Sequence, residues 1–268
     1  MTAPAATDSS LRGRCALITG STQGLGLAAA RAFAAAGCSV MLNGLAPIGE
    51  AAALRADLEA RFHVRAGFSG ADLRRANDIE RMVADAAASL GAVDILVNNA
   101  VVRHSDPIER FPIDKWDEAL AVNVSAAFHT IRLALPGMRD RNWGRIINVS
   151  SIYGLRGATN RIGYVAAKTA LIGVTRAVAL ETAGQNITCN AICPGTVETP
   201  VHEVEIERLI AEGATRADAE RRFLAAKQPT GRFISADGVA AFMVFLCGPE
   251  AADISGAALP IDGGWAIR

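Results

Sequence analysis

A tyrosine and a lysine four residues apart are the pair in this sequence best suited to moving a proton. Tyr164 and Lys168 lie in a predicted helix, and this spacing places the phenol and the ammonium on one helix face. A phenol with a pKa near 10 is a poor base at neutral pH, and a nearby cation favours its ionised form. Lowering that pKa by about 3 units requires about 4 kcal/mol. Ser151 ends a predicted strand 13 residues before Tyr164, so its hydroxyl could hold a substrate oxygen while Tyr164 exchanges the proton.

A glycine-rich turn earlier in the chain is typical of a phosphate site. The segment Thr19-Gly20-Ser21-Thr22-Gln23-Gly24-Leu25-Gly26 follows a short apolar run and precedes an alanine-rich stretch. Glycines between a strand end and a helix start let the backbone approach a pyrophosphate, whose charge is favoured by free N–H groups and by the helix dipole. The spacing is G-x-x-x-G-x-G and differs from the G-x-G-x-x-G pattern. The prediction of a phosphate site therefore depends on the position of the turn between a strand and a helix as well as on the glycines.

The end of the second predicted strand bears on which nicotinamide dinucleotide would bind. An acidic residue there would hydrogen-bond the adenosine ribose, and a basic one would bind a 2′-phosphate. The sequence has Asn43-Gly44-Leu45 instead, and the glycine turn contains no Arg or Lys. The missing cation favours NAD and leaves NADP open. Asp72 and Leu73, after a presumed third strand, are expected beside the adenine, although Asp72 could equally cap the helix that follows.

Alternating strands and helices must position these groups. Val93 to Asn98 is apolar without alternation, which is typical of a parallel strand buried on both faces. Repeated β-α units predict an α/β fold, a Rossmann-type doubly wound parallel sheet with helices on both faces. Such sheets bind ligands at the carboxyl ends of their strands. Further strands are expected at 15–19, 39–43, 145–150, 187–192 and 257–261. Helices are expected after the glycine turn up to about Ala36, and at 50–61 and 79–90.

One segment interrupts the alternation. Residues 201–227 carry mixed charge with apolar residues at helical spacing, and Thr215 three before Asp218 indicates a helix start. Because this segment follows a strand end, residues 197–227 are interpreted as a helical lid over the ligand crevice; the alternative is a plain surface helix pair. Residues 1–10 are expected to form a disordered tail, and residues 11–268 a single domain.

The charge balance excludes some partners. Lys+Arg 27 and Asp+Glu 27 give zero net charge, whereas nucleic acid or an anionic membrane requires a cationic excess. The five cysteines show neither a disulfide framework nor metal-ligand spacing, so small buried residues and no metal site are expected. No signal peptide is apparent, and the longest apolar run, Val239 to Cys247, is too short to cross a bilayer, which predicts a cytoplasmic protein.

Together these motifs resemble the short-chain dehydrogenase/reductase family. Thr19 to Gly26, Asn98-Asn99-Ala100, Asn123, Ser151, Tyr164, Lys168, Pro194-Gly195 and Thr199 follow that family's order and spacing, over about residues 11–265. The resemblance implies that Asn123 holds a water in a proton relay with Lys168, that Lys168 binds the nicotinamide ribose, and that the protein is a homotetramer. The cofactor-binding residues predicted in this way are Gly20, Thr22, Gly24, Leu25, Gly26, Asn43, Asp72, Leu73, Asn99, Tyr164, Lys168, Pro194, Gly195, Val197 and Thr199.

Within this family, framework stretches such as 142–148 and 262–265 are most similar to bacterial D-3-hydroxybutyrate dehydrogenases. The polar cradle that those enzymes use for a carboxylate differs, because the matching positions are Arg103, Tyr153, Arg161 and Glu205. Arginine can grip a carboxylate with two parallel hydrogen bonds, so Arg103 or Arg161 is predicted to clamp an anion. The alternative is that both are solvated loop residues. Glu205 would repel the anion unless it turns outward or pairs with an arginine.

The predicted function is NAD-dependent hydride transfer at the secondary alcohol carbon of a small hydroxy acid similar to 3-hydroxybutyrate. Alternatives are a dehydrogenase or reductase for a sugar, polyol or other secondary alcohol, and a dinucleotide-binding regulator without turnover. The expected substrate-binding residues are Arg103, Ser151, Tyr153, Arg161, Tyr164 and Glu205. His104 is expected to be a solvated loop residue without a role, and Trp116, Trp143 and Trp265 are expected to pack.

Overall fold

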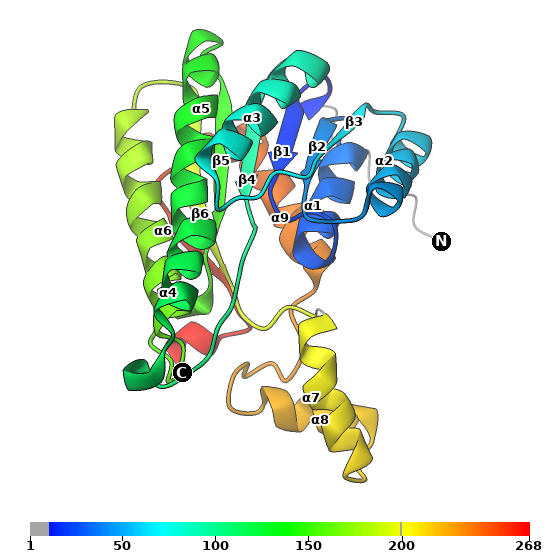
Figure 1. Cartoon of the computed structure of the whole chain (residues 1–268), viewed down its shortest axis with the longest axis vertical. Helices are drawn as coiled ribbons and strands as arrows, with labels where there is room; N and C mark the ends of the chain where they lie inside the picture. Colours follow the sequence, from blue (N-terminus) through cyan, green and yellow to red (C-terminus); the bar gives the residue numbers. More distant parts are fainter. Residues whose placement is uncertain (1–10, 199) are drawn as a thin grey trace.

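The chain folds around one parallel sheet. A computed structural model describes residues 11–198 and 200–268. Its strands lie in the order β3-β2-β1-β4-β5-β6-β7 and all are parallel, which confirms the predicted doubly wound arrangement (Figure 1). Their bounds are β1 (Cys15–Ile18), β2 (Ser39–Asn43), β3 (Ala66–Ser69), β4 (Ile95–Asn98), β5 (Gly144–Val149), β6 (Ile187–Pro194) and β7 (Ala258–Ile261).

Helices cover both faces of the sheet (Figure 1). One face carries α1 (Gly24–Ala35), α2 (Ile48–Phe62) and α9 (Ala236–Cys247), and the other carries α3 (Ala76–Leu90), α5 (Ala126–Asp140) and α6 (Ile162–Glu181). The helix α4 (Ile113–Leu120) continues into α5 through a π-helical segment, η3 (Ala121–Ser125). Short 3-10 helices occupy Ile108–Arg110, Ile152–Gly154, Pro249–Ala251 and Trp265–Ile267.

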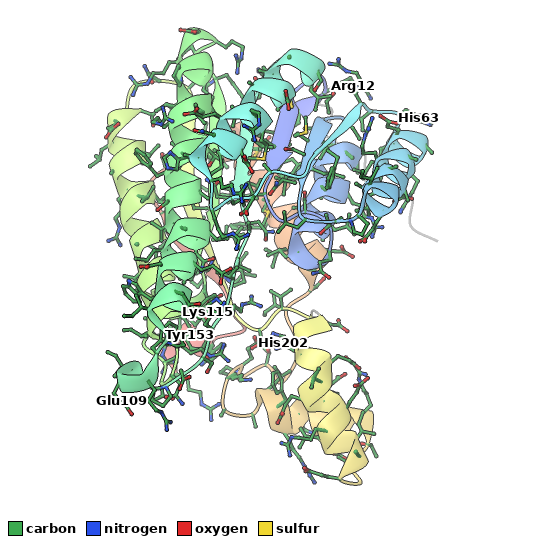
Figure 2. All side chains as sticks on the ribbon, in the orientation of Figure 1. Arg12, His63, Glu109, Lys115, Tyr153 and His202 are labelled. Atoms are coloured by element: carbon green, nitrogen blue, oxygen red, sulfur yellow. The ribbon has the colours of Figure 1, made fainter. Side chains whose placement is uncertain are left out.

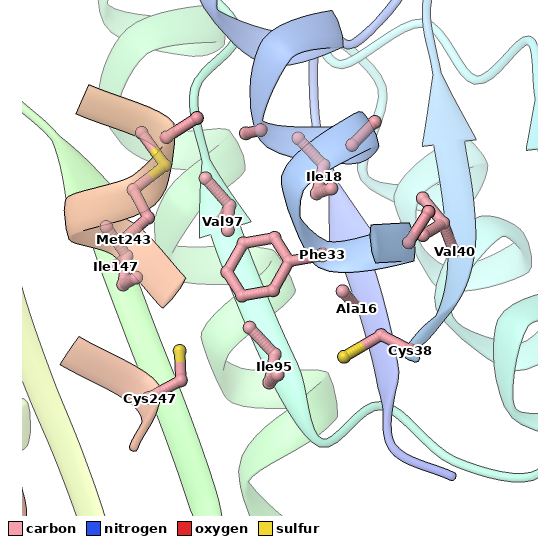
Figure 3. Close-up of a cluster of buried hydrophobic side chains, with 14 of the residues drawn as sticks. Ala16, Ile18, Phe33, Cys38, Val40, Ile95, Val97, Ile147, Met243 and Cys247 are labelled. Carbon is pink, nitrogen blue, oxygen red and sulfur yellow. The ribbon is translucent and has the colours of Figure 1, made fainter. Parts of the chain in front are cut away.

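The packing of the core explains why apolar and polar residues do not alternate along the strands. Ala16 and Ile18 of β1 belong to the apolar cluster beneath α1 and α9, whereas Cys15 and Leu17 belong to the cluster beneath α3 and α5. Phe33 of α1 is fully buried in the first cluster, with side chains from several strands around it (Figure 3). Because both faces are covered, most strand positions carry apolar side chains, and polar side chains such as Asn98 and Asn148 are hydrogen-bonded to one another.

The sheet changes its winding direction between β1 and β4. These strands are neighbours, although β2 and β3 separate them in sequence, and their following loops lead to opposite faces of the sheet. The loops begin side by side: Thr19 N donates to the Val97 carbonyl oxygen at 3.0 Å, and Asn99 N donates to Thr19 Oγ1 at 3.0 Å. A crevice at the carboxyl ends is the consequence of this topology.

Two helices extend away from the sheet (Figure 1). They are α7 (Pro200–Ala211) and α8 (Arg216–Leu224), and residues 200–224 are called the α7–α8 excursion below. Thr215 caps α8 by accepting a hydrogen bond from Asp218 N at 3.2 Å, which confirms the predicted helix start. Arg216 forms an ion pair with Glu203 of α7, which links the two helices, and a second with Glu220 within α8. The tail predicted for residues 1–10 lies outside the described residues.

Two helical stretches, Ile113–Asp140 and Ile162–Glu181, are long and apolar enough by length and composition to cross a membrane. Neither is an uninterrupted apolar run, because charged residues such as Lys115 and Lys168 interrupt them. Both stretches pack on the sheet through buried side chains such as Ile131 and Leu171.

The five cysteines are buried and unpaired, as predicted. Burial raises the pKa of Cys15, Cys38 and Cys189 to about 12. These thiols are therefore protonated at neutral pH and fill the core as small apolar groups.

Candidate active site

A cavity of about 950 Å³ lies at the carboxyl ends of the central strands. This volume is at the upper end of those that hold small ligands and cofactors. Predicted residues in its wall are Gly20, Thr22, Gly24, Leu25, Gly26, Asn43, Asp72, Leu73, Asn99, Arg103, Ser151, Tyr164, Lys168, Pro194, Gly195 and Val197. Asn123, Tyr153, Arg161 and Glu205 are not in the wall, and Thr199 lies outside the described residues.

The glycine turn after β1 lets backbone and side-chain groups come closer together than a Cβ atom would allow. Gly20 and Gly24 have φ angles of 62° and 54°, in the left-handed region that favours glycine. A Cβ on Gly26 would lie 2.2 Å from the Gly20 carbonyl oxygen and 2.5 Å from Asn99 Nδ2. The turn leads directly into the N-terminus of α1, whose N-cap residue Gln23 makes no side-chain capping bond. The first N–H groups of α1 thus face the cavity, and the turn fits a dinucleotide pyrophosphate.

Two asparagines of the cavity wall use their side chains to connect loops. Asn43 Oδ1 accepts from Gly20 N at 3.3 Å, and its Nδ2 donates to the Ser69 and Ala71 carbonyl oxygens at 3.1 Å each. Asn99 Nδ2 donates to the Thr19 and Gly20 carbonyl oxygens at 3.0 and 2.9 Å. The two amide groups fix the backbone conformation of the glycine turn. Asn43 and Asn99 therefore shape this part of the cavity wall by positioning backbone groups of the surrounding loops.

Asp72 does not cap α3, whose N-cap is Arg75. Its carboxylate instead accepts from the Arg74 backbone N–H at 3.0 Å and from the Arg74 guanidinium at 2.6 to 3.1 Å. Hydrogen bonding to Arg74 lowers the pKa of Asp72 to about 2. The cation in this part of the wall is therefore neutralised by the acid beside it.

Tyr164 and Lys168 face the cavity from the first turns of α6. Lys168 is 2% exposed, its Nζ donates to the Val149 carbonyl oxygen at 2.7 Å, and it lies 5.7 Å from the Tyr164 ring centroid. Burial raises the pKa of Tyr164, but Lys168, Arg103 and a hydrogen bond with Ser151 outweigh burial, and the net pKa is lowered. Burial lowers the pKa of Lys168, and the Tyr164 phenolate opposes this effect. The arrangement favours the phenolate that proton abstraction needs.

Ser151 lies where β5 gives way to a 3-10 turn. Its Oγ accepts a hydrogen bond from Tyr153 N at 3.2 Å, which caps the turn and fixes the hydroxyl at the cavity wall. Its neighbour Ser150 donates to the Lys168 carbonyl oxygen at 2.7 Å, which ties this loop to α6. Ser151, Tyr164 and Lys168 are thus brought together by β5 and α6.

Asn123 lies in the π-helical segment η3 and is buried. Its Oδ1 accepts from Val102 N at 2.9 Å, and its Nδ2 donates to the Val102 carbonyl oxygen at 3.0 Å. The side chain therefore anchors the loop after β4, and one lone pair of Oδ1 and one N–H of Nδ2 remain for the predicted relay water. π-Turns inside helices commonly occur at functional sites.

The predicted substrate residues differ in their surroundings. Arg103 is exposed, with its guanidinium 5.5 Å from the Tyr164 ring centroid. Tyr153 packs edge-on against Tyr164, with ring centroids 6.2 Å apart. Glu205 pairs with Arg208 at 2.6 Å, which is one of the two arrangements under which it would not repel an anion. Arg161 precedes α6 as its N-cap residue.

His202 and Lys227 were not singled out from the sequence. His202, on α7, lies in the cavity wall, where burial and the neighbouring cations Arg103, Lys227 and Arg161 lower its pKa to about 4. Figure 2 shows His202 where the α7–α8 excursion leaves the rest of the molecule. An excursion following a strand end was the signal that could have identified His202.

His104 is not the solvated residue that was expected, because its Nε2 lies 2.9 Å from Glu118 Oε2 and its side chain is only 24% exposed. The tryptophans pack as predicted. The guanidinium carbons of Arg14 and Arg145 lie 3.9 and 4.6 Å from the Trp143 ring centroid, and Trp265 is buried against Tyr153. Trp116 is half-buried.

Comparison with known proteins agrees with this geometry. The family model described as short chain dehydrogenase matches residues 14–209. The chain is 45% identical over 260 residues to a D-beta-hydroxybutyrate dehydrogenase of Cupriavidus necator, covering 96% of this chain and 100% of the relative. It is 41% identical to the D-beta-hydroxybutyrate dehydrogenase of Rhizobium meliloti, covering 95% and 99%.

A solved structure has the same architecture. L-sorbose reductase from Gluconobacter frateurii, complexed with NADPH and L-sorbose, superposes with a TM-score of 0.90 at 31% identity, covering 96% of this chain and 98% of that one. The family match, the full-length relatives and the shared sheet agree with one another. The chain therefore belongs to the short-chain dehydrogenase family and is an oxidoreductase.

Proposed function

We propose that this enzyme oxidises the secondary alcohol carbon of a small 3-hydroxy acid similar to 3-hydroxybutyrate, reversibly and with NAD. The observation that carries the proposal is the guanidinium of Arg103, 5.5 Å from the ring of Tyr164, because it supplies a carboxylate partner beside the proton-transfer group. Identity of 45% to a D-beta-hydroxybutyrate dehydrogenase over the whole of that relative supports the same substrate class.

In this proposal Ser151 holds the substrate oxygen and the Tyr164 phenolate takes the hydroxyl proton. Lys168 keeps the phenol ionised and binds the nicotinamide ribose. A bound nicotinamide dinucleotide supplies the hydride acceptor. The proton then leaves Tyr164 through Lys168 and a water held by Asn123. In the reverse direction Tyr164 returns the proton to the carbonyl oxygen, so one residue serves as base and as acid.

NAD is proposed over NADP because of the charges near the adenosine end of the cavity. The strand end has Asn43-Gly44-Leu45, without a cation for a 2′-phosphate. Arg74, in the same wall, is held by Asp72 at 2.6 Å. We expect kcat/KM for NAD to exceed that for NADP at least tenfold. A ratio near one would contradict this reading of the β2 end.

The α7–α8 excursion is proposed to act as a lid, since His202 on α7 contributes to the cavity wall. A homotetramer is proposed as well. Exposed apolar side chains on α5 and α6, Phe128 at 53% and Leu180 at 79%, are available for subunit contacts. Light scattering at micromolar concentration would test the assembly.

The substrate assignment is tested with purified enzyme, NAD and a panel of both 3-hydroxybutyrate enantiomers, other hydroxy acids and polyols, followed by absorbance of the reduced nicotinamide. Oxidation of a 3-hydroxy acid with the highest kcat/KM supports the proposal. Preference for a polyol would favour the sugar or polyol alternative, and tight NAD binding without any turnover would favour a regulator.

Two variants test the assigned roles. Tyr164→Phe should abolish turnover and leave the Kd for NAD nearly unchanged; more than about a tenth of the wild-type kcat would contradict the proton-transfer role. Arg103→Gln should raise KM for the hydroxy acid at least tenfold. A change below about twofold would remove Arg103 from substrate binding.

A further inference from the structure

The α7–α8 excursion leaves the sheet and returns to it through two segments that lie side by side. Residues 195–198 lead from β6 toward α7, and residues 225–234 lead from α8 toward α9. Ile234 N donates to the Thr196 carbonyl oxygen at 2.9 Å, and Glu198 N donates to the Ile234 carbonyl oxygen at 3.2 Å. Parallel backbone pairing therefore joins the two segments at the base of the excursion.

Gln228 joins the same two segments through its side chain. It is 1% exposed, its Oε1 accepts a hydrogen bond from Thr196 N, and its Nε2 donates to the Arg232 carbonyl oxygen. Its own backbone N–H donates to the Leu224 carbonyl oxygen at 3.0 Å, at the end of α8. Because an amide has both a donor and an acceptor, this one buried side chain satisfies a backbone group of each segment.

Gln228 lies close against the backbone that precedes Thr196. A Cβ on Gly195 would lie 2.6 Å from Gln228 Oε1 and 3.0 Å from Asp262 Cα. Since glycine has no Cβ, the amide can reach the backbone N–H of Thr196. Gly195 and Val197 line the cavity, whereas Gln228 does not. Gln228 therefore acts on the cavity wall through the backbone of Thr196, which lies between the two lining residues.

This part of the wall adjoins the proton-transfer group. β5 and β6 are neighbouring parallel strands, and Ser150 N donates to the Ile192 carbonyl oxygen at 2.8 Å. Ser151 and Gly195 thus follow the ends of adjacent strands at the same edge of the sheet. The substrate carbon must lie beside Ser151 and Tyr164, and hydride transfer requires the acceptor ring of the dinucleotide to contact that carbon. The wall after β6 is therefore at the nicotinamide end of the cavity.

We propose that Gln228 is a positioning residue for the nicotinamide. It ties the backbone from Gly195 to Val197 to the returning end of the excursion, so that the wall beside the nicotinamide keeps a fixed position. Without the amide, the buried backbone N–H of Thr196 would lose its partner, and an unpaired buried N–H is unfavourable enough to displace the backbone. The inference rests on the proposed binding of a nicotinamide dinucleotide and adds a residue outside the cavity wall.

The test compares NAD with ADP-ribose, which lacks the nicotinamide, by calorimetry. Gln228→Met keeps the approximate size of the side chain and removes both of its hydrogen bonds. It should raise the Kd for NAD at least about fivefold and leave the Kd for ADP-ribose within about twofold of the wild-type value. Gln185→Met makes the same change at an exposed position between α6 and β6 and should alter neither Kd. If the wild type prefers NADP, the pair of ligands is NADP and 2′-phospho-ADP-ribose.

A purely structural role of Gln228 would weaken the binding of both ligands alike. Equal increases in the two Kd values of Gln228→Met, or no increase in either, would therefore overturn the inference. Because neither ligand is a hydroxy acid, a lack of turnover on every hydroxy acid would refute the proposed substrate and leave this inference standing.

Hydrogen exchange in the wild-type enzyme gives a second measurement that does not depend on how the variants fold. At saturating concentrations, NAD should slow exchange of the Thr196 amide more than ADP-ribose does, because only NAD places a ring against this wall. Equal exchange rates with the two ligands would refute a role of this segment at the nicotinamide end.

Discussion

Replacing Lys168 with methionine would test how Tyr164 becomes a base. Lys168 Nζ lies 5.7 Å from the Tyr164 ring centroid, and both side chains are buried. At an effective dielectric constant of about 20, two unit charges at this separation interact by about 3 kcal/mol, which corresponds to about 2 pKa units. This is the larger part of the about 4 kcal/mol needed to ionise the phenol near neutral pH. Arg103 and Ser151 act in the same direction.

The assay is the pH dependence of kcat/KM for alcohol oxidation. Because the base must be deprotonated, a higher pKa moves the acidic limb of the profile to higher pH. Lys168→Met should therefore shift that limb upward by about 2 units. Lys168→Arg keeps the charge and should shift the limb much less. If the methionine variant loses rate equally at all pH values, with the limb in place, Lys168 acts through cofactor binding and the electrostatic reasoning is refuted.

Further predictions concern the turn, the histidine and the thiols. Gly26→Ala should abolish NAD binding measured by calorimetry, because the added Cβ would lie 2.2 Å from the Gly20 carbonyl oxygen. Gly173→Ala is the control: Gly173 lies in an open position of α6, so this change should raise the free energy of unfolding by about 0.5–1 kcal/mol in thermal unfolding. Wild-type NAD affinity in Gly26→Ala would refute the close-approach argument. The His202 imidazole should titrate near pH 4 by NMR, because burial and neighbouring cations lower its pKa; a midpoint near the ordinary value of 6.5 would contradict this. A thiol reagent should modify less than about one cysteine per chain in the native protein at neutral pH and all five after denaturation, since burial protects Cys15, Cys38, Cys189, Cys193 and Cys247. Rapid modification of two or more in the native state would count against this core.

Much of the fold could be predicted because its signals are local. The expected strands are all present and their ends differ by two residues at most from those in the structure. Apolar runs buried on both faces, helical stretches between them and the turn from Gly20 to Gly26 each depend on neighbouring residues. The helix spacing of Tyr164 and Lys168 is local as well, so the face that they share needed no knowledge of the sheet.

Side-chain partners were less predictable. Asn43 and Asn99 resemble cofactor ligands in the sequence, but their amide groups connect loops that meet only because β1 lies between β2 and β4. Asp72 could cap a helix by its position, yet it binds Arg74. A polar residue at a strand end has several possible partners, and the packed loops decide among them.

The sequence by itself determined the doubly wound sheet, the glycine turn and the proton-transfer pair, because strand burial, left-handed glycine geometry and helix periodicity are properties of short segments. Only the folded chain shows that His202 of α7 lines the cavity and that burial, Arg103, Lys227 and Arg161 lower its pKa. These four residues come from separate parts of the chain, and their distances depend on how the α7–α8 excursion packs on the sheet. No local pattern specifies that packing, so the electrostatics of the substrate end exist only in the folded chain.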